Sequence, residues 1–383
     1  MKNTWISWAA GIAVLGALAG CGPKEEAKPA DQAAGPAAEE PVLHVYNWSD
    51  YIAEDTLEKF TQATGIKVVY DVFDSNDVVE AKLLAGNTGY DVVVPSLHFL
   101  GRQVTAGVFA KLDKAQIPNY QNLDPALMAN IAKVDPGNEH AVPYLWGTTG
   151  IGYNVDKVKE ALGADVPLNS WDLIFKPENL AKLSKCGVSI LDEAAEVIPT
   201  TLHYLGKDPN DFAANVTLVP GEVKDLWMKL RPYITYFHSS RYINDLANGD
   251  ICVALGWSGD IFQAATRAAE AKNNVKVEYV IPQEGAGIWV DMLAIPKDAN
   301  HPGNAHKFIN FLLQPAIMAS VTNHVWYANG VPASKDMTDQ AILAHPGIYP
   351  APETEQKMFT FAVVPPELDG VYADVWTEVK AGQ

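Results

Sequence analysis

The sequence IKVVYDVFDSNDVVEAKLLAGNTGYDVVVPS, residues 66–96, contains two β-branched runs with a helical segment between them. The runs at 66–72 and 90–96 end in turn residues and predict strands. The stretch 75–87 begins with an N-cap signal and closes on Ala-Gly-Asn, which predicts a helix with both ends marked. Residues 54–65, EDTLEKFTQATG, show the same helical pattern. This alternation predicts a mainly parallel α/β sheet covered by helices.

Aromatic and acidic residues stand at the end of an earlier strand, which the alternating run VLHVYN, residues 42–47, predicts. The sequence YNWSDY, residues 46–51, lies at the end of this first strand, and Pro95 and Ser96 follow a later strand. Ligands of open α/β sheets bind outside the carboxyl ends of the strands. We therefore expect both segments to lie at the ligand-binding edge of one sheet.

The first 41 residues differ from the rest of the chain. Residues 1–20 combine a lysine near the start, an apolar stretch and small residues before Cys21, which predicts a signal peptide. The sequence LAGC, which ends at Cys21, resembles a bacterial lipobox and predicts lipidation of that cysteine. An ordinary secretory signal with a chance cysteine is the alternative. Residues 21–41 contain no aromatic residue and are rich in Gly, Pro, Ala and charge, which predicts a flexible linker.

Composition limits the classes of partner. The chain has 383 residues and a net charge of −18, so it is a poor candidate for binding nucleic acid or anionic lipid. The part after the linker, about 340 residues, is long enough for two domains. Cys186 and Cys252 form an isolated pair in an exported chain, which favours a disulfide over two free buried thiols.

Motifs for enzymatic chemistry are incomplete. The sequence GWSGD, residues 256–260, lacks the last glycine of a nucleophile elbow because Asp260 occupies that position. The sequence GTTGIGYNVD, residues 147–156, has Val155 at the third glycine position and resembles a strand more than a phosphate-binding loop. The nine histidines are scattered singly. We therefore expect no catalytic residues, no metal and no cofactor.

Four segments place aromatic residues in strand ends or loops, three of them beside a carboxylate. They are Trp48 with Asp50 and Tyr51, Trp257 with Asp260, Trp289 with Asp291, and Trp326 with Tyr327. Each segment alone is also typical of core packing beside a solvated acid. Four of them in one acidic, exported chain favour a binding site.

An organic cation with a hydrocarbon middle suits these residues. Ring faces attract ammonium groups by about 0.5–2 kcal/mol each and also pack against methylene groups. Carboxylates provide charge-assisted hydrogen bonds to the ends of such a ligand. A metal ion would need clustered oxygens without the rings, and a sugar would need fewer acids.

Several stretches then carry a resemblance to one family. They are VYNWSDYI, GIKVVYDVFDSN, TTGIGYNVDKV, NSWDLIFKPENL, FHSSRYINDLANGDICVALGWSGD and HVWYAN. From about Val42 to the C-terminus, the chain resembles the periplasmic spermidine/putrescine-binding proteins of polyamine ABC importers, in particular the putrescine-binding branch. The resemblance implies a type II periplasmic-binding-protein fold, in which two α/β domains close about a hinge over a ligand cleft.

The resemblance also implies function and location. We expect a periplasmic, non-enzymatic monomer, anchored to the membrane only through lipid on Cys21, that delivers a polyamine to a membrane permease. A sensor that uses the same binding site to signal to a membrane partner is the alternative. The expected N-terminal domain comprises 42–142 and 289–333, and the C-terminal domain comprises 143–288 and 334–383. The chain is expected to cross between them near Pro143, Ile288 and Ala333.

By position, the resemblance implies a set of ligand-binding residues. They are Trp48, Ser49, Asp50, Tyr51, Ser96, Glu193, Glu196, Trp257, Asp260, Trp289, Asp291 and Tyr327. Asp50 is expected to face an ammonium group, Glu196 to hold an amine, and Asp260 to anchor the other amine. Cys186 and Cys252 match the disulfide of the family.

Two positions depart from the putrescine-binding pattern. Trp289 stands where putrescine binders have phenylalanine, and Glu193 adds an acid where they have a small residue. Because a third amine needs another acceptor and a longer wall, these residues favour spermidine over putrescine. His98 counts against that preference, since a cationic imidazole near Ser96 would repel an amine, whereas a neutral imidazole could accept a hydrogen bond from one.

Overall fold

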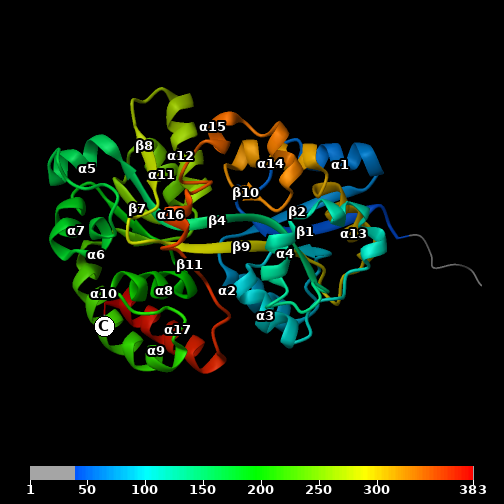
Figure 1. The fold of residues 1–383 in the computed structure, drawn as a ribbon, viewed down its shortest axis with the longest axis horizontal. Helices are drawn as coiled ribbons and strands as arrows, with labels where there is room; N and C mark the ends of the chain where they lie inside the picture. The colour runs from blue at the N-terminus through cyan, green and yellow to red at the C-terminus, as the bar shows by residue number, and fades with distance from the viewer. Residues whose placement is uncertain (1–38, 383) are drawn as a thin grey trace, which may run out of the picture. The chain divides into compact units, whose positions relative to one another are not determined.

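A single sheet runs through residues 39–382, the part of the chain that the computed structural model describes (Figure 1). The predicted signal peptide and Cys21 lie outside these residues. Within them, no helix is both long and apolar enough to cross a membrane.

The strands of the sheet are β1 (Val42–Trp48), β2 (Lys67–Phe73), β3 (Val92–Val93), β4 (Ala141–Asn154), β5 (Val188–Ile190), β6 (Tyr236–Phe237), β7 (Val253–Trp257), β8 (Val277–Val280), β9 (Gly287–Ala294), β10 (Ala328–Asn329) and β11 (Phe359–Thr360).

The α-helices are α1 (Thr56–Thr64), α2 (Asn76–Ala85), α3 (Leu97–Thr105), α4 (Pro125–Ile131), α5 (Val155–Leu162), α6 (Asp172–Phe175), α7 (Pro177–Leu183), α8 (Ala194–Tyr204), α9 (Phe212–Leu218), α10 (Lys224–Leu230), α11 (Tyr242–Asn248), α12 (Ser258–Ala271), α13 (Pro302–Leu312), α14 (Pro315–Val325), α15 (Gln340–Leu343), α16 (Pro352–Glu355) and α17 (Pro366–Ala381).

Strand order divides the sheet into two halves around an antiparallel centre. The order is β2-β1-β3-β9-β4-β7-β5-β6, with β8 and β10 paired to β4 and β11 paired to β9. Strand β1 is parallel to β2 and β3, and β5 is parallel to β6 and β7. Strands β4 and β9 are antiparallel to each other. The predicted parallel α/β pattern is therefore confirmed in each half, and the antiparallel centre was not foreseen.

Strands β4 and β9 connect the two halves. Near its start β4 pairs with β9, and from Thr149 onward it pairs with β7. The pairing of β4 with β9 shifts register between Pro143 and Trp146. Proline lacks the N–H that the ladder needs, which accounts for an irregularity there. Pro143 and Ile288, two of the expected domain crossings, lie on these strands, and the domain boundaries themselves stay a prediction.

Local signals in residues 54–96 set the elements as the sequence predicts. The Ser75 side chain caps α2 by accepting a hydrogen bond from the Asp77 N–H at 3.1 Å. Gly86, at φ 70°, follows the last turn of α2 in a conformation that favours glycine. Strand β3 is shorter than predicted because Pro95 and the start of α3 interrupt the run.

Helices cover each half of the sheet, and aromatic side chains pack these helices together. In the first half, Phe60 of α1 is fully buried and its ring centroid lies 5.0 Å from that of Phe308 in α13. In the second half, Trp227 of α10 is fully buried and packs edge-to-face against Trp376 of α17 at 5.4 Å. Full burial of one such side chain stabilises the fold by about 1.5–3 kcal/mol.

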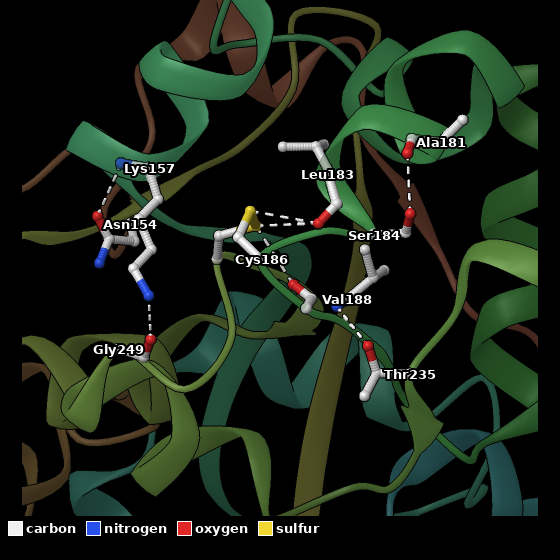
Figure 2. The surroundings of a disulfide bond; sticks show 11 residues. Asn154, Lys157, Ala181, Leu183, Ser184, Cys186, Val188, Thr235 and Gly249 are labelled. Atoms are coloured by element: carbon white, nitrogen blue, oxygen red, sulfur yellow. Dashed lines mark hydrogen bonds between the residues drawn. A yellow bond between two sulfur atoms is a disulfide. The ribbon is translucent and has the colours of Figure 1, made fainter.

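The disulfide between Cys186 and Cys252 is present, as the sequence predicts (Figure 2). It joins the segment after α7 to the residue that precedes β7, and 66 positions separate the two cysteines. The bond therefore fixes the start of β7, the strand that ends at Trp257.

Candidate functional site

A cavity lies at the ends of strands from both halves of the sheet. The residues that line it are Trp48, Ser49, Tyr51, Phe73, Asp74, Ser96, Glu196, Ser239, Ser240, Trp257, Asp260, Trp289, Asp291 and Tyr327.

The topology explains why these residues meet. Trp48 and Phe73 end the parallel strands β1 and β2, and Ser96 follows β3. In the second half, Ser239 follows β6 and Trp257 ends β7. The cavity thus lies at the carboxyl ends of parallel strands, where the sequence predicted the ligand-binding edge.

Three indole rings and a phenol form a continuous aromatic wall. The ring centroids of Trp48 and Trp257 are 5.4 Å apart with an interplanar angle of 76°. Trp257 and Trp289 are 6.5 Å apart at 77°, and Trp289 and Tyr327 are 5.3 Å apart at 61°. These edge-to-face contacts hold the rings against one another along the wall of the cavity.

Asp260 lies at the start of α12 and is nearly completely buried. Its two carboxylate oxygens accept hydrogen bonds from the hydroxyls of Tyr242 and Tyr327, each at 2.7 Å. The Tyr327 hydroxyl also accepts a bond from the Asp260 N–H at 3.1 Å. A carboxylate has about four acceptor positions, so Asp260 retains capacity for a cationic ligand.

Asp291 and Glu196 are buried and held in the same manner. Asp291 accepts hydrogen bonds from Ser96 Oγ at 2.6 Å and from the Tyr51 hydroxyl at 2.7 Å. Glu196 Oε2 accepts from Thr149 Oγ1 at 2.5 Å and from Trp257 Nε1 at 2.9 Å. Neutral donors orient these acids, and the described residues that line the cavity include no cationic side chain.

Burial dominates the electrostatics of the three acids. It raises the pKa of Glu196, Asp260 and Asp291 to about 7 each, while hydrogen bonds from neighbouring hydroxyls and the Trp257 indole act in the opposite direction. A bound dication would replace the lost solvation of the carboxylates and favour their ionised form. The site is therefore suited to positive charge.

Gly259 has a packing role in the GWSGD segment. A Cβ added at this residue would lie 2.4 Å from Cε2 of the Tyr327 ring. The glycine lets Tyr327 approach α12 and reach Asp260. This close approach, rather than a nucleophile elbow, accounts for the glycine at that position.

The structure brings together all of the predicted ligand-binding residues except Asp50 and Glu193. Asp50 does not line the cavity, and its Oδ1 lies 2.6 Å from Nη2 of Arg267. Its expected contact with an ammonium group stays a prediction. Glu193 is fully buried outside the cavity, where its Oε2 accepts a hydrogen bond from the Asn76 N–H at 3.2 Å.

Sequence reasoning did not select four of the lining residues, which are Phe73, Asp74, Ser239 and Ser240. All four lie in the stretches FDSN and FHSS that carry the resemblance, so position after a strand was the signal that could have found them. Trp326, from the fourth aromatic segment, is not in the cavity and packs against Phe262 at 5.8 Å.

His98 does not oppose cation binding. The residue is buried in α3 and is not among those that line the cavity. Burial, followed by the charge of Arg102, lowers the pKa of His98 to about 3. The imidazole is therefore neutral at physiological pH.

The fold and the cavity define a bacterial solute-binding protein, and sequence comparison shows the same class. The family of bacterial extracellular solute-binding proteins matches residues 55–351, so the chain belongs to this family. Its members named below are binding proteins rather than enzymes.

The chain is similar to named relatives along nearly its whole length. It is 57% identical to the putrescine-binding periplasmic protein SpuD of Pseudomonas aeruginosa, covering 91% of this chain and 94% of the relative. It is 56% identical to the putrescine-binding periplasmic protein PotF of Escherichia coli, covering 91% and 93%. The crystal structure of the spermidine/putrescine ABC transporter substrate-binding protein PotD from Streptococcus pneumoniae is similar with a TM-score of 0.69 and 28% identity, covering 89% and 99%.

These relatives correct one expectation. The sequence departures at Trp289 and Glu193 favoured spermidine, but the two relatives above 50% identity are named for putrescine. Of the two residues that favoured spermidine, Glu193 does not line the cavity and therefore cannot receive a third amine there. A preference for spermidine is not supported.

Proposed function

We propose that the chain binds a short aliphatic diamine of the putrescine class in this cavity and delivers it to the permease of an ABC importer. The observation that carries the proposal is a cavity with three indole rings, at least three buried carboxylates and no lysine, arginine or histidine among its lining residues. Such a cavity has negative charge for two ammonium groups and apolar rings for the methylene chain between them.

The energies are sufficient for physiological binding. Each buried methylene contributes about 0.8 kcal/mol and each cation–π contact about 0.5–2 kcal/mol. Charge-assisted hydrogen bonds to the carboxylates add to these contributions. Together they can exceed the cost of association and reach the roughly 8 kcal/mol that micromolar affinity requires.

We also propose that the cavity closes between two domains with the boundaries given above. Ion pairs link segments assigned to different domains: Arg267 with Asp50, and Arg102 with Asp369 at 2.7 Å. Ligand contacts to Asp291 and Asp260, one in each domain, would favour the closed arrangement because only differential affinity shifts such an equilibrium. Export, attachment through Cys21 and a monomeric state remain parts of this proposal.

Calorimetric titration of the ligand-free protein with putrescine, cadaverine, agmatine and spermidine tests the proposal. We expect one binding site, with putrescine bound more tightly than spermidine. The Trp289 ring packs so closely on Gly147 that a Cβ on this glycine would lie 2.8 Å from Cζ2 of the ring. Trp289→Phe therefore enlarges the cavity beside Gly147. We expect this variant to change affinity by less than tenfold and to keep the order of the amines. Tighter binding of spermidine by the unmodified protein would contradict the proposed ligand class.

Affinity for the diamine is expected to fall at acidic pH. The ligand needs ionised carboxylates, and the pKa of Asp260 and Asp291 is raised to about 7. Below pH 7 binding must therefore release protons, which weakens affinity by about tenfold per pH unit for each proton released. Titrations at pH 8 and pH 6, in buffers with different ionisation enthalpies, measure both the change in Kd and the protons released. Equal Kd values at the two pH values would contradict the expected ionisation.

The same pKa shifts act with the opposite sign on the empty protein. A carboxyl whose pKa is raised by folding stabilises the folded state most at a pH below its unfolded value of about 4. That contribution is lost as the pH rises through about 7. These acids therefore make the ligand-free fold less stable under the conditions in which they bind best.

A further inference from the structure

A second group of side chains with metal-binding chemistry lies at the opposite end of the same strands. His44 is near the start of β1, Asp91 directly precedes β3, and His301 directly precedes α13. The cavity, in contrast, lies after the last residues of β1 and β3. The metal-binding group therefore lies at the amino ends of these parallel strands, and the cavity lies at their carboxyl ends.

The three side chains converge on one point. Nδ1 of His301 is 3.0 Å from Oδ2 of Asp91, and Nδ1 of His44 is 3.5 Å from the same oxygen. One candidate ligand atom from each residue lies within 4.8 Å of the other two. Ligand atoms of a tetrahedral zinc ion are about 3.4 Å apart, given bond lengths near 2.1 Å. Small side-chain rotations would thus complete the geometry.

Backbone hydrogen bonds hold the carboxylate in position. The N–H of His301 donates to Oδ1 of Asp91 at 2.8 Å, and the N–H of His44 donates to Oδ2 at 2.9 Å. Asp91 is almost completely buried, so its orientation is restricted. Outer hydrogen bonds of this kind orient metal ligands and increase affinity.

The site is accessible from solvent on one side. The His44 side chain is 35% exposed, whereas that of His301 is 13% exposed. The two imidazole rings are stacked with their centroids 6.0 Å apart. An ion can therefore reach the group past His44 without opening the core.

We propose that His44, Asp91 and His301 form a binding site for a divalent transition-metal ion of the zinc class, separate from the amine cavity. Two imidazole nitrogens and one carboxylate oxygen suit zinc, nickel or copper better than calcium or magnesium, which prefer oxygen ligands. Three protein ligands leave a fourth position for water. Binding of the ion would tie the start of α13 to strands β1 and β3.

Titration of the tag-free protein with zinc chloride in competition with a chromophoric chelator tests this site. We expect one zinc equivalent to bind, and His44→Gln and His301→Gln each to weaken its affinity by at least about tenfold. His324→Gln, an exposed histidine on α14, is the matched control and should leave the affinity unchanged. Circular dichroism checks that each variant is folded.

Cobalt substitution gives an independent readout. A cobalt ion held by two imidazoles and a carboxylate should produce visible absorption in the unmodified protein that is lost in His44→Gln. Zinc binding of equal affinity in His44→Gln and the unmodified protein would overturn the proposal, as would the absence of any stoichiometric zinc binding. In the latter case the group serves only to hydrogen-bond the start of α13 to the sheet. Neither outcome depends on the amine, because no residue of this group lines the cavity.

Discussion

Asp260→Asn is expected to weaken putrescine binding by about 2–5 kcal/mol, or at least about thirtyfold in Kd. The substitution keeps the volume of the side chain but removes the negative charge that the proposed ligand needs. It also places an amide nitrogen where one of the two tyrosine hydroxyls now donates to a carboxylate oxygen at 2.7 Å. Calorimetry of the variant at pH 8 measures the loss.

A matched substitution separates charge in the cavity from charge of the whole protein. Asp336 is exposed and lies outside the cavity. Asp336→Asn removes the same charge, and we expect it to change Kd by less than threefold. Loss of affinity in both variants would assign the effect to overall charge. Unchanged binding in Asp260→Asn would remove Asp260 from the site.

Loss of the disulfide is expected to lower the free energy of unfolding by about 4 kcal/mol in the chain-entropy model. The bond closes a loop between Cys186 and Cys252, which are 66 positions apart, and thereby restricts the unfolded chain. The double variant Cys186→Ala with Cys252→Ala should show this loss in urea-induced unfolding.

The reduced unmodified protein is the control for this variant, because it loses the bond but keeps both sulfur atoms. A similar loss on reduction would assign the effect to the cross-link rather than to side-chain packing. We expect the affinity for putrescine to be retained, because the disulfide precedes β7 and the cavity lies after its last residue. A stability loss below 1 kcal/mol in both samples would contradict the entropic account.

Local sequence determined much of the first half of the fold. The N-cap Ser75, the glycine after α2 and the β-branched runs at 66–72 and 90–96 act within a few residues of each other. They predict a strand, helix and strand unit that the structure confirms. The long antiparallel strands β4 and β9 were not foreseen because their paired residues are far apart in the chain. Even the pair nearest in sequence, Thr149 and Gly287, is 138 positions apart.

Most of the cavity residues were predicted by position through the family resemblance, whereas strand topology alone predicted only residues 46–51 and 95–96 at this edge of the sheet. Trp48 and Trp257 meet at 5.4 Å although they are far apart in sequence, because each ends a strand of the sheet. The orientation of Asp50 was not predictable, because its partner Arg267 lies on a helix 217 positions away. The burial of Glu193 likewise depends on the backbone of Asn76, 117 positions away.

A crystal structure of the protein grown with putrescine tests the central claim most directly. We predict density for one diamine in the cavity, with its methylene chain against Trp257 and Trp289. An ammonium nitrogen should lie about 2.8 Å from a carboxylate oxygen of Asp260 or Asp291. A saturated protein with the diamine bound elsewhere, and with no ligand density between these rings and acids, would contradict the account.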